Sequence, residues 1–166
     1  MKTAVVFFSR DGNTRLAADL LAHRLGADVF ELEEGKKRGK SAASFMAAGF
    51  GASFGLRSRL KTSFAQELRE YDRICIGSPV WAGKTVPAVN AFIHGLDAAG
   101  KQIILFTVQA DPQPETKAPQ SLNTHKQALE TKGASVTYLL RIHGAPPGKT
   151  ADAKSIQIQL DNQLAG

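Results

Sequence analysis

The sequence has few of the features that cross-link a protein or anchor it in a membrane. Its single cysteine, Cys75, cannot form an internal disulfide, and it lies in an apolar stretch, RICIGSPV, that predicts a buried thiol. No run approaches the roughly 20 apolar residues that a membrane-spanning helix needs. The opening MKTAVVFFSR lacks the cleavage pattern of a signal peptide and predicts a strand instead. We therefore expect a reducing, cytoplasmic setting, with no disulfide framework and no membrane span.

Side chains that build metal centres or catalytic triads are also sparse. The four histidines fall in separate predicted elements, and no group of cysteines or carboxylates accompanies them. They are His23, His94, His125 and His143. The pattern predicts no metal ligands and no catalytic residues of the acid–base type, so we expect each histidine to be incidental to function.

Acidic residues are absent from one long stretch of the chain. The formal net charge is +6, yet the segment from Lys36 to Lys61 alone carries seven positive charges and no negative one. These are Lys36, Lys37, Arg38, Lys40, Arg57, Arg59 and Lys61. Such a segment favours an acidic protein, a nucleotide, nucleic acid or an anionic membrane as partner, although a solvated loop explains it equally well. Of these partners we expect an acidic protein and not nucleic acid.

What the sequence does contain is an alternation of apolar strands and amphipathic helices. Leucines at helical spacing predict a helix that Asp11 or Asn13 caps and Gly26 ends. Strands are predicted at 2–8, 28–32, 73–77, 102–108 and 135–142. Further helices are predicted at 62–70, 86–96, 121–132 and from about 150 onward, with a short one within 45–54.

This order predicts the fold class. Its length of 166 residues suits one domain, residues 1–166, in which a basic connector, residues 34–61, interrupts the alternation. The strands are apolar throughout, as in a parallel sheet that helices cover on both faces. We therefore expect a three-layer, doubly wound α/β domain with a five-stranded parallel sheet. Ligands of such sheets bind beyond the carboxyl ends of the strands.

Two predicted loops at that edge carry residues that could bind a ligand. The first, SRDGNT at 9–14, joins a strand to a helix, and its backbone N–H groups with the helix N-terminus predict an anion site. The second, GSPVWAGK at 77–84, holds the only tryptophan of the chain, Trp81, beside two glycines. An aromatic ring there can stack on a flat cofactor while bare backbone approaches it. An ordinary capped turn and a Trp81 packed on the next helix are the simpler alternatives.

Both loops resemble the flavodoxin family, and the resemblance spans nearly the whole chain. SRDGNT is similar to the family's phosphate loop, commonly Ser/Thr-x-Thr-Gly-Asn-Thr, and GSPVWAGKTVP is similar to the loop that holds the flavin ring. The resemblance implies a flavodoxin-like sheet with strand order 2-1-3-4-5 and flavin mononucleotide (FMN) as cofactor. It also implies electron transfer to a redox partner protein by a monomer or homodimer.

The resemblance further implies a set of cofactor-binding residues. They are Ser9, Arg10, Gly12, Asn13 and Thr14 for the phosphate, with Asp11 among them; Pro79, Val80, Trp81, Ala82 and Gly83 for the isoalloxazine ring; and Thr107, Val108, Gln109 and Ala110 for its pyrimidine edge.

Two departures from the family pattern leave the function open. Asp11 stands where a hydroxyl is usual, so it either pairs with Arg10 or Arg15 or weakens phosphate binding. The segment TVQADPQPETKAP has no aromatic residue to cover the second face of the flavin, which leaves room for a hydride donor or a quinone. Three alternatives follow: an electron carrier, an FMN-dependent NAD(P)H:quinone or nitro-compound reductase, and a flavodoxin-like module that has lost flavin binding.

Overall fold

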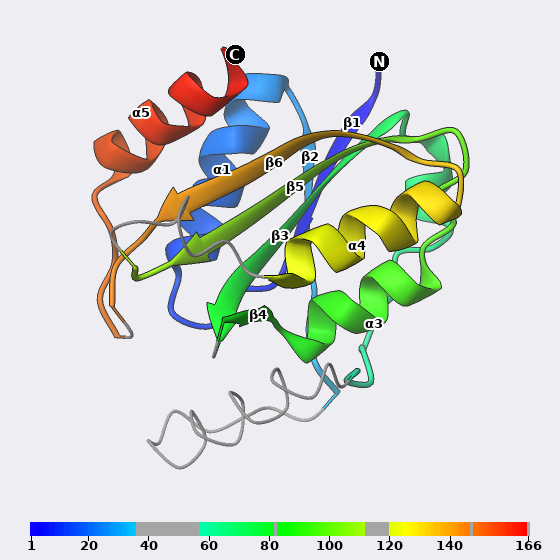
Figure 1. The fold of residues 1–166 in the computed structure, drawn as a ribbon, viewed down its shortest axis with the longest axis horizontal. Helices are drawn as coiled ribbons and strands as arrows, with labels where there is room; N and C mark the ends of the chain where they lie inside the picture. Colours follow the sequence, from blue (N-terminus) through cyan, green and yellow to red (C-terminus); the bar gives the residue numbers. More distant parts are fainter. Residues whose placement is uncertain (36–56, 82, 112–119, 147, 166) are drawn as a thin grey trace.

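The structure is a computed structural model that describes residues 1–35, 57–81, 83–111, 120–146 and 148–165. Figure 1 shows how its helices and strands are arranged. In chain order they are β1 (Thr3–Phe7), α1 (Asn13–Leu25), β2 (Asp28–Glu31), the 3₁₀ turn η1 (Glu67–Glu70), β3 (Arg73–Trp81), β4 (Lys84–Thr85), α3 (Pro87–Gly95), β5 (Gln102–Gln109), α4 (Gln120–Thr131), β6 (Ser135–His143) and α5 (Ala153–Leu164).

The sheet confirms the predicted doubly wound α/β class. Its path runs β2-β1-β3-β5-β6, and every neighbouring pair on that path is parallel. Helices α1 and α5 cover one face and α3 and α4 the other (Figure 1). One short strand was not predicted: β4 pairs antiparallel with the end of β3 through Val80 and Thr85 and through Trp81 and Lys84. Within the described residues no helix is long and apolar enough to span a membrane.

The core lies on both faces of the sheet because the strands are apolar on both sides. Every residue of β1 is buried, and burial of one such apolar side chain stabilises the fold by about 1.5–3 kcal/mol. Gly77 in β3 is required where the packing is closest. A Cβ there would lie 2.1 Å from the ring of Phe106 on the neighbouring strand, so only glycine leaves that ring in place.

Helix α1 starts differently from the prediction. Its N-cap is Gly12 in the left-handed region at φ 88°, and neither Asp11 nor Asn13 caps it with a side chain. The hydroxyl of Ser9 instead accepts a hydrogen bond of 3.2 Å from the backbone N–H of Arg15. The predicted end is confirmed, because Gly26 lies in the left-handed region as the C-cap.

The helix predicted for residues 62–70 is wrong over most of its length. Only η1 at its end is helical, and Phe64 has a positive φ of 53° that an α-helix cannot contain. Its ring packs instead against Phe30 of β2, with centroids 5.2 Å apart. The helix predicted within 45–54 lies outside the described residues. The two ends of the basic connector meet, since Gly35 donates a backbone hydrogen bond of 2.8 Å to the carbonyl of Arg59.

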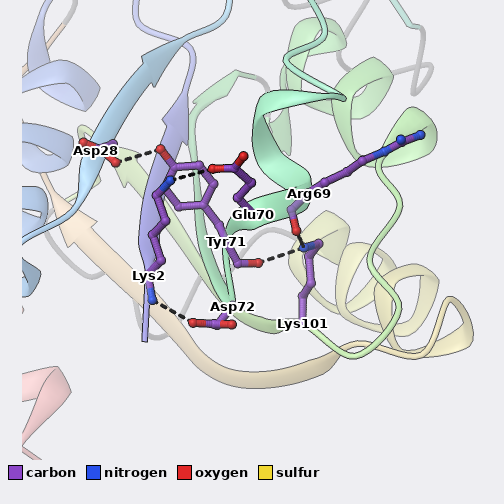
Figure 2. Close-up of polar contacts among 7 residues, drawn as sticks. All are labelled: Lys2, Asp28, Arg69, Glu70, Tyr71, Asp72 and Lys101. Carbon is purple, nitrogen blue, oxygen red and sulfur yellow. Dashed lines mark hydrogen bonds and ion pairs between the residues drawn. The ribbon is translucent and has the colours of Figure 1, made fainter.

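Where the strands begin, which we call the amino edge of the sheet, charged groups pair with one another (Figure 2). The ammonium of Lys2 contacts Glu70 at 3.0 Å and lies 4.5 Å from the centre of the Tyr71 ring. The Tyr71 hydroxyl donates to Asp28 at 2.7 Å, and this bond is the largest cause of a raised pKa for Tyr71. Lys101 donates to the carbonyls of Arg69 and Tyr71. We call these contacts a closed network, because each of these groups has a partner within the chain. The network links the residues just before β1, β3 and β5 with the start of β2.

Candidate functional site

A groove lies at the opposite edge, where the parallel strands end, which we call the carboxyl edge. Its empty space, open mouth included, is about 510 Å³. Its walls come from the segment after β1 and from the ends of β3 and β5, as expected for a doubly wound sheet. The lining residues are Arg10, Asp11, Asn13, Thr14, Pro79, Val80, Trp81, Val108, Gln109, Ala110 and Ala145.

The first wall is the start of α1. Asn13 and Thr14 form its first turn, where backbone N–H groups have no partner inside the helix and point toward its N-terminal end. These N–H groups and the helix dipole attract an anion. Thr14 is buried and lines the groove beside them. This wall can therefore hold a phosphate.

The side chain of Asn13 has a second task that the sequence did not indicate. Its Nδ2 donates to the carbonyl of Lys149 at 2.7 Å. Its Oδ1 accepts from the backbone N–H groups of Ala145 at 3.3 Å and Ala151 at 2.8 Å. The amide thus ties α1 to the segment after β6 and brings Ala145 to the groove. A phosphate would meet mainly the backbone N–H of Asn13, because its side-chain Nδ2 already donates to Lys149.

The second wall is the hairpin formed by the end of β3 and by β4. Pro79, Val80 and Trp81 line the groove from it, and the turn is closed by Gly83 at a φ of 73°. The Trp81 ring meets Phe8 edge to face at 5.9 Å between centroids. The guanidinium of Arg10 lies over the Trp81 ring at 5.5 Å from its centroid, within the range of a cation–π interaction. Trp81 is therefore a groove residue and not only a core residue.

The third wall is the end of β5. Val108, Gln109 and Ala110 line the groove there. The Gln109 side chain is buried, and its Nε2 has no hydrogen-bond partner within the described structure. A buried amide donor without a partner costs about 1–3 kcal/mol, so its retention at a groove wall indicates a ligand acceptor. Thr107 Oγ1 is also buried without a partner, but Thr107 does not line the groove.

Charges in the groove are few and mixed. Arg10 and Asp11 both line it. Of the two arginines considered as partners for Asp11, Arg15 pairs instead with Glu31 at the end of β2. The basic connector contributes less net positive charge than its sequence indicates, because Lys61 pairs with Glu33. Asp11 therefore lines a groove whose first wall can hold an anion.

The structure brings together most of the residues that the sequence predicted, and it adds one. Ser9, Gly12 and Thr107 stand next to lining residues in the chain without lining the groove themselves. Gly83 lies two residues after the lining residue Trp81, and Ala82 lies outside the described residues. Ala145 was missed because nothing in its sequence context indicates the hydrogen bond to Asn13, which is 132 residues away. In the described part of the chain, no three His, Cys, Asp or Glu side chains gather as a metal site would require.

Two titratable groups, Cys75 and His125, have pKa values that burial shifts strongly. Burial raises the pKa of the Cys75 thiol to about 12, so it stays protonated and unreactive, as predicted. His125 of α4 was predicted to be incidental, yet its Nε2 lies 2.6 Å from the Thr85 hydroxyl in β4. Burial lowers its pKa to about 4, so the imidazole is neutral at neutral pH. No pattern in the sequence pairs His125 with a residue 40 positions earlier.

Comparison with known proteins agrees with this geometry. A model of the flavodoxin family matches residues 2–135 of the chain. No curated protein sequence matches it. Many solved structures share its fold.

Three of these structures illustrate the range. A flavoprotein from Lactobacillus acidophilus, solved in complex with FMN, is 17% identical with a TM-score of 0.65, over 84% of this chain and 92% of that chain. Oxidised flavodoxin 2 from Bacillus cereus is 22% identical with a TM-score of 0.57, over 96% of both chains. A WrbA-like flavodoxin from Agrobacterium tumefaciens is 16% identical with a TM-score of 0.62, over 99% of this chain and 95% of that chain.

Proposed function

The chain belongs to the flavodoxin family, and we propose that it is an electron-transfer flavoprotein whose cofactor, FMN, binds in the groove at the carboxyl edge. The observation that carries the proposal is the buried, unpartnered Nε2 of Gln109 in a groove that also contains the N-terminus of α1 and Trp81. An anion site, an aromatic ring and a buried donor in one groove match the phosphate, the ring and the carbonyl groups of FMN. The FMN-bound flavoprotein from Lactobacillus acidophilus, which has the same fold, supports this assignment.

Each wall has a distinct task in this proposal. The backbone N–H groups of Asn13 and Thr14 bind the phosphate, with the Thr14 hydroxyl beside them. Trp81 covers one face of the isoalloxazine ring and excludes water from it. Gln109 donates a hydrogen bond to the pyrimidine edge, which gives its buried amide a partner. FMN supplies the redox chemistry, so the protein needs only to bind, orient and tune it.

The direct test is the visible spectrum of the purified protein, followed by titration of the FMN-free protein with FMN. We expect flavin absorption and quenching of most of the fluorescence of Trp81, the single tryptophan. Thr14→Ala should weaken FMN by about 1–3 kcal/mol, the range for a hydrogen bond to a charged group. Absence of FMN binding at millimolar concentration would contradict the proposal and favour a module that has lost flavin.

A reductase is the second candidate, favoured by one observation. The segment from Thr107 to Pro119 contains no aromatic residue, so a flavin held on one side by Trp81 has no ring from that segment on its other face. An uncovered face admits a hydride donor or a quinone. Anaerobic mixing of the FMN-loaded protein with NADH or NADPH decides between the two: rapid bleaching of the flavin supports a reductase. Unchanged absorbance supports a carrier that is reduced by another protein.

For the carrier we propose an acidic partner protein in the cytoplasm. Arg57 and Arg59 at the end of the basic connector are both exposed. Their replacement by glutamate should slow reduction by an acidic partner and flatten its dependence on salt, with little change in stability. Lys154→Glu, at an exposed position in the first turn of α5, is the matched control. Equal rates for both variants at every salt concentration would show that the connector is not the docking surface.

A further inference from the structure

His125 makes a partly buried contact with the hairpin of the second wall, and no part of the proposed function uses it. Its Nε2 lies 2.6 Å from Oγ1 of Thr85, and Thr85 is only 2% exposed. The same Thr85 hydroxyl donates to Oδ1 of Asn90 in α3 at 2.9 Å. One polar chain therefore links α4, β4 and α3 inside the protein.

The direction of these bonds follows from the number of protons. A threonine hydroxyl has one proton, and that proton is donated to Asn90. The imidazole of His125 must then donate from Nε2 to the lone pair of Thr85 Oγ1. Burial keeps the ring neutral, with its pKa lowered to about 4, so the Nε2–H tautomer is the form that the contact selects.

This contact joins the hairpin of the second wall to helix α4. Thr85 is paired with Val80, and its neighbour Lys84 is paired with Trp81, so the position of β4 sets the position of two lining residues. Helix α4, which carries His125, follows the segment after β5, whose end forms the third wall. A hydrogen bond from α4 to β4 therefore fixes the second wall relative to α4, the next helix after the third wall.

Packing alone does not require a histidine at this position. Leu122 and Leu129 of α4 are both almost fully buried in the core on that face. They supply the apolar area that holds the helix on the sheet. His125 adds a directed bond to one atom of the hairpin, which an apolar side chain cannot make.

We propose that His125 is a positioning residue that holds the β3–β4 hairpin, and with it Trp81, in place for the flavin ring. The proposal rests on the proposed function only in naming FMN as the occupant. The positioning itself is present in the FMN-free protein and can be measured there. It makes His125 a determinant of how tightly the ring is held and not a catalytic residue.

The test compares His125→Leu, which loses the donor, with His125→Gln, whose Nε2 can replace it. In the FMN-free protein, His125→Leu should lower the fluorescence anisotropy of Trp81 and raise its quenching by acrylamide. In the presence of FMN, its dissociation constant should rise about tenfold, the loss expected for one buried hydrogen bond. His125→Gln should restore both values. His94→Leu, at an exposed position near the end of α3, is the control and should change neither.

A second pair of variants keeps the test valid if His125→Leu does not fold. Thr85→Val removes the acceptor without changing the size of the side chain, and Thr85→Ser keeps it. The valine variant should reproduce the loosened Trp81 and the weaker FMN binding, and the serine variant should not. Wild-type Trp81 signals in His125→Leu, or equal losses in the leucine and glutamine variants, would overturn the proposal. Failure of the wild-type protein to bind FMN would overturn the proposed function alone, because the Trp81 measurements need no flavin.

Discussion

The two edges of the sheet use polar residues in opposite ways. At the amino edge, Lys2, Glu70 and Tyr71 contact one another or Asp28, and the network is closed (Figure 2). At the carboxyl edge, Gln109 Nε2 is buried without a partner in the described structure. The same strands run through both edges, so the difference does not come from the fold class. It comes from which polar groups have found a partner within the chain.

This difference separates stability from binding. A closed network contributes to the free energy of folding, and little remains in it for a ligand to satisfy. A buried donor without a partner lowers the stability of the free protein. When a ligand supplies the acceptor, this penalty is removed and binding is strengthened. We therefore expect substitutions at the amino edge to change stability alone. Substitutions at the carboxyl edge should change FMN affinity, with stability unchanged or improved.

The largest expected effect comes from Gly77, which lies between the two edges. A substitution there should change both stability and FMN binding, so it is an exception to the division between edges. In Gly77→Ala the new methyl group would lie 2.1 Å from the Phe106 ring, and neither neighbouring backbone can move freely within the sheet. The free energy of unfolding should fall by about 3 kcal/mol, as for overpacked cores, and FMN binding should weaken with it. Urea denaturation measures the first quantity.

Gly95→Ala is the matched control for that change. Gly95 ends α3, and a Cβ there meets no atom within 4 Å. Alanine is the better helix former, so stability should stay equal or rise by up to about 1 kcal/mol. If Gly77→Ala proved as stable as Gly95→Ala, the Phe106 ring would have an alternative position that the structure does not indicate.

A second prediction sharpens the comparison along one strand, because β5 has a glutamine at each end. Gln109→Leu should weaken FMN about tenfold, which is about 1.4 kcal/mol, and should raise the stability of the FMN-free protein. Gln102→Leu should instead lower stability. At the amino edge, Gln102 Oε1 accepts hydrogen bonds from Arg73 at 3.0 and 3.3 Å, so its loss should cost about 1 kcal/mol and leave FMN binding unchanged. Equal behaviour of the two variants would contradict the division between edges.

Tyr71→Phe tests the closed network with a smaller expected effect. Loss of the hydroxyl bond to Asp28 should lower stability by about 1 kcal/mol at pH 7 without changing FMN affinity. The same bond raises the pKa of Tyr71 above its ordinary value of 10.0, so the folded state favours the neutral phenol. The contribution is therefore complete below pH 10 and is lost as pH rises through the folded pKa. The stability difference between wild type and variant should shrink in that range, and Tyr138→Phe is the control.

The sequence predicted the fold because its signals are local and mutually consistent. The apolar strands, the leucine spacing of α1 and the terminal Gly26 each act within a few residues. The helix predicted at 62–70 failed where a distant contact overrode local preference, because Phe64 packs on Phe30 with a backbone conformation that a helix excludes. The two-residue β4 was missed because so short a strand has no periodicity of its own.

The site was predictable to the extent that its residues lie at strand ends. The loop at 9–14, Trp81 and Gln109 all lie within a few residues of the ends of predicted strands, and the structure brings Trp81, Gln109 and most of that loop to one groove. The tasks of individual side chains were not predictable, because their partners are distant in the chain. The Asn13 amide binds the segment after β6, and His125 binds a threonine of β4. Both bonds exist only once the sheet has brought these segments together.

The smallest expected effect is a change in FMN affinity on removal of the Asp11 carboxylate. Aspartates have different roles at the two edges. At the amino edge, Asp28 and Asp72 accept hydrogen bonds from Tyr71 and Lys2 and belong to the closed network. Asp11 lines the groove beside the anion site of α1, where a negative charge repels the phosphate of FMN. Asp11→Asn keeps the shape and removes the charge, so FMN should bind about threefold more tightly at low ionic strength. The gain should fade as salt shortens the screening length to about 10 Å at 0.1 M.

Asp19→Asn, at an exposed position on the same helix as Asn13 and Thr14, is the control for this change. Isothermal titration at two salt concentrations measures both effects, and an affinity equal to wild type at each would mean that the Asp11 carboxylate points away from the phosphate.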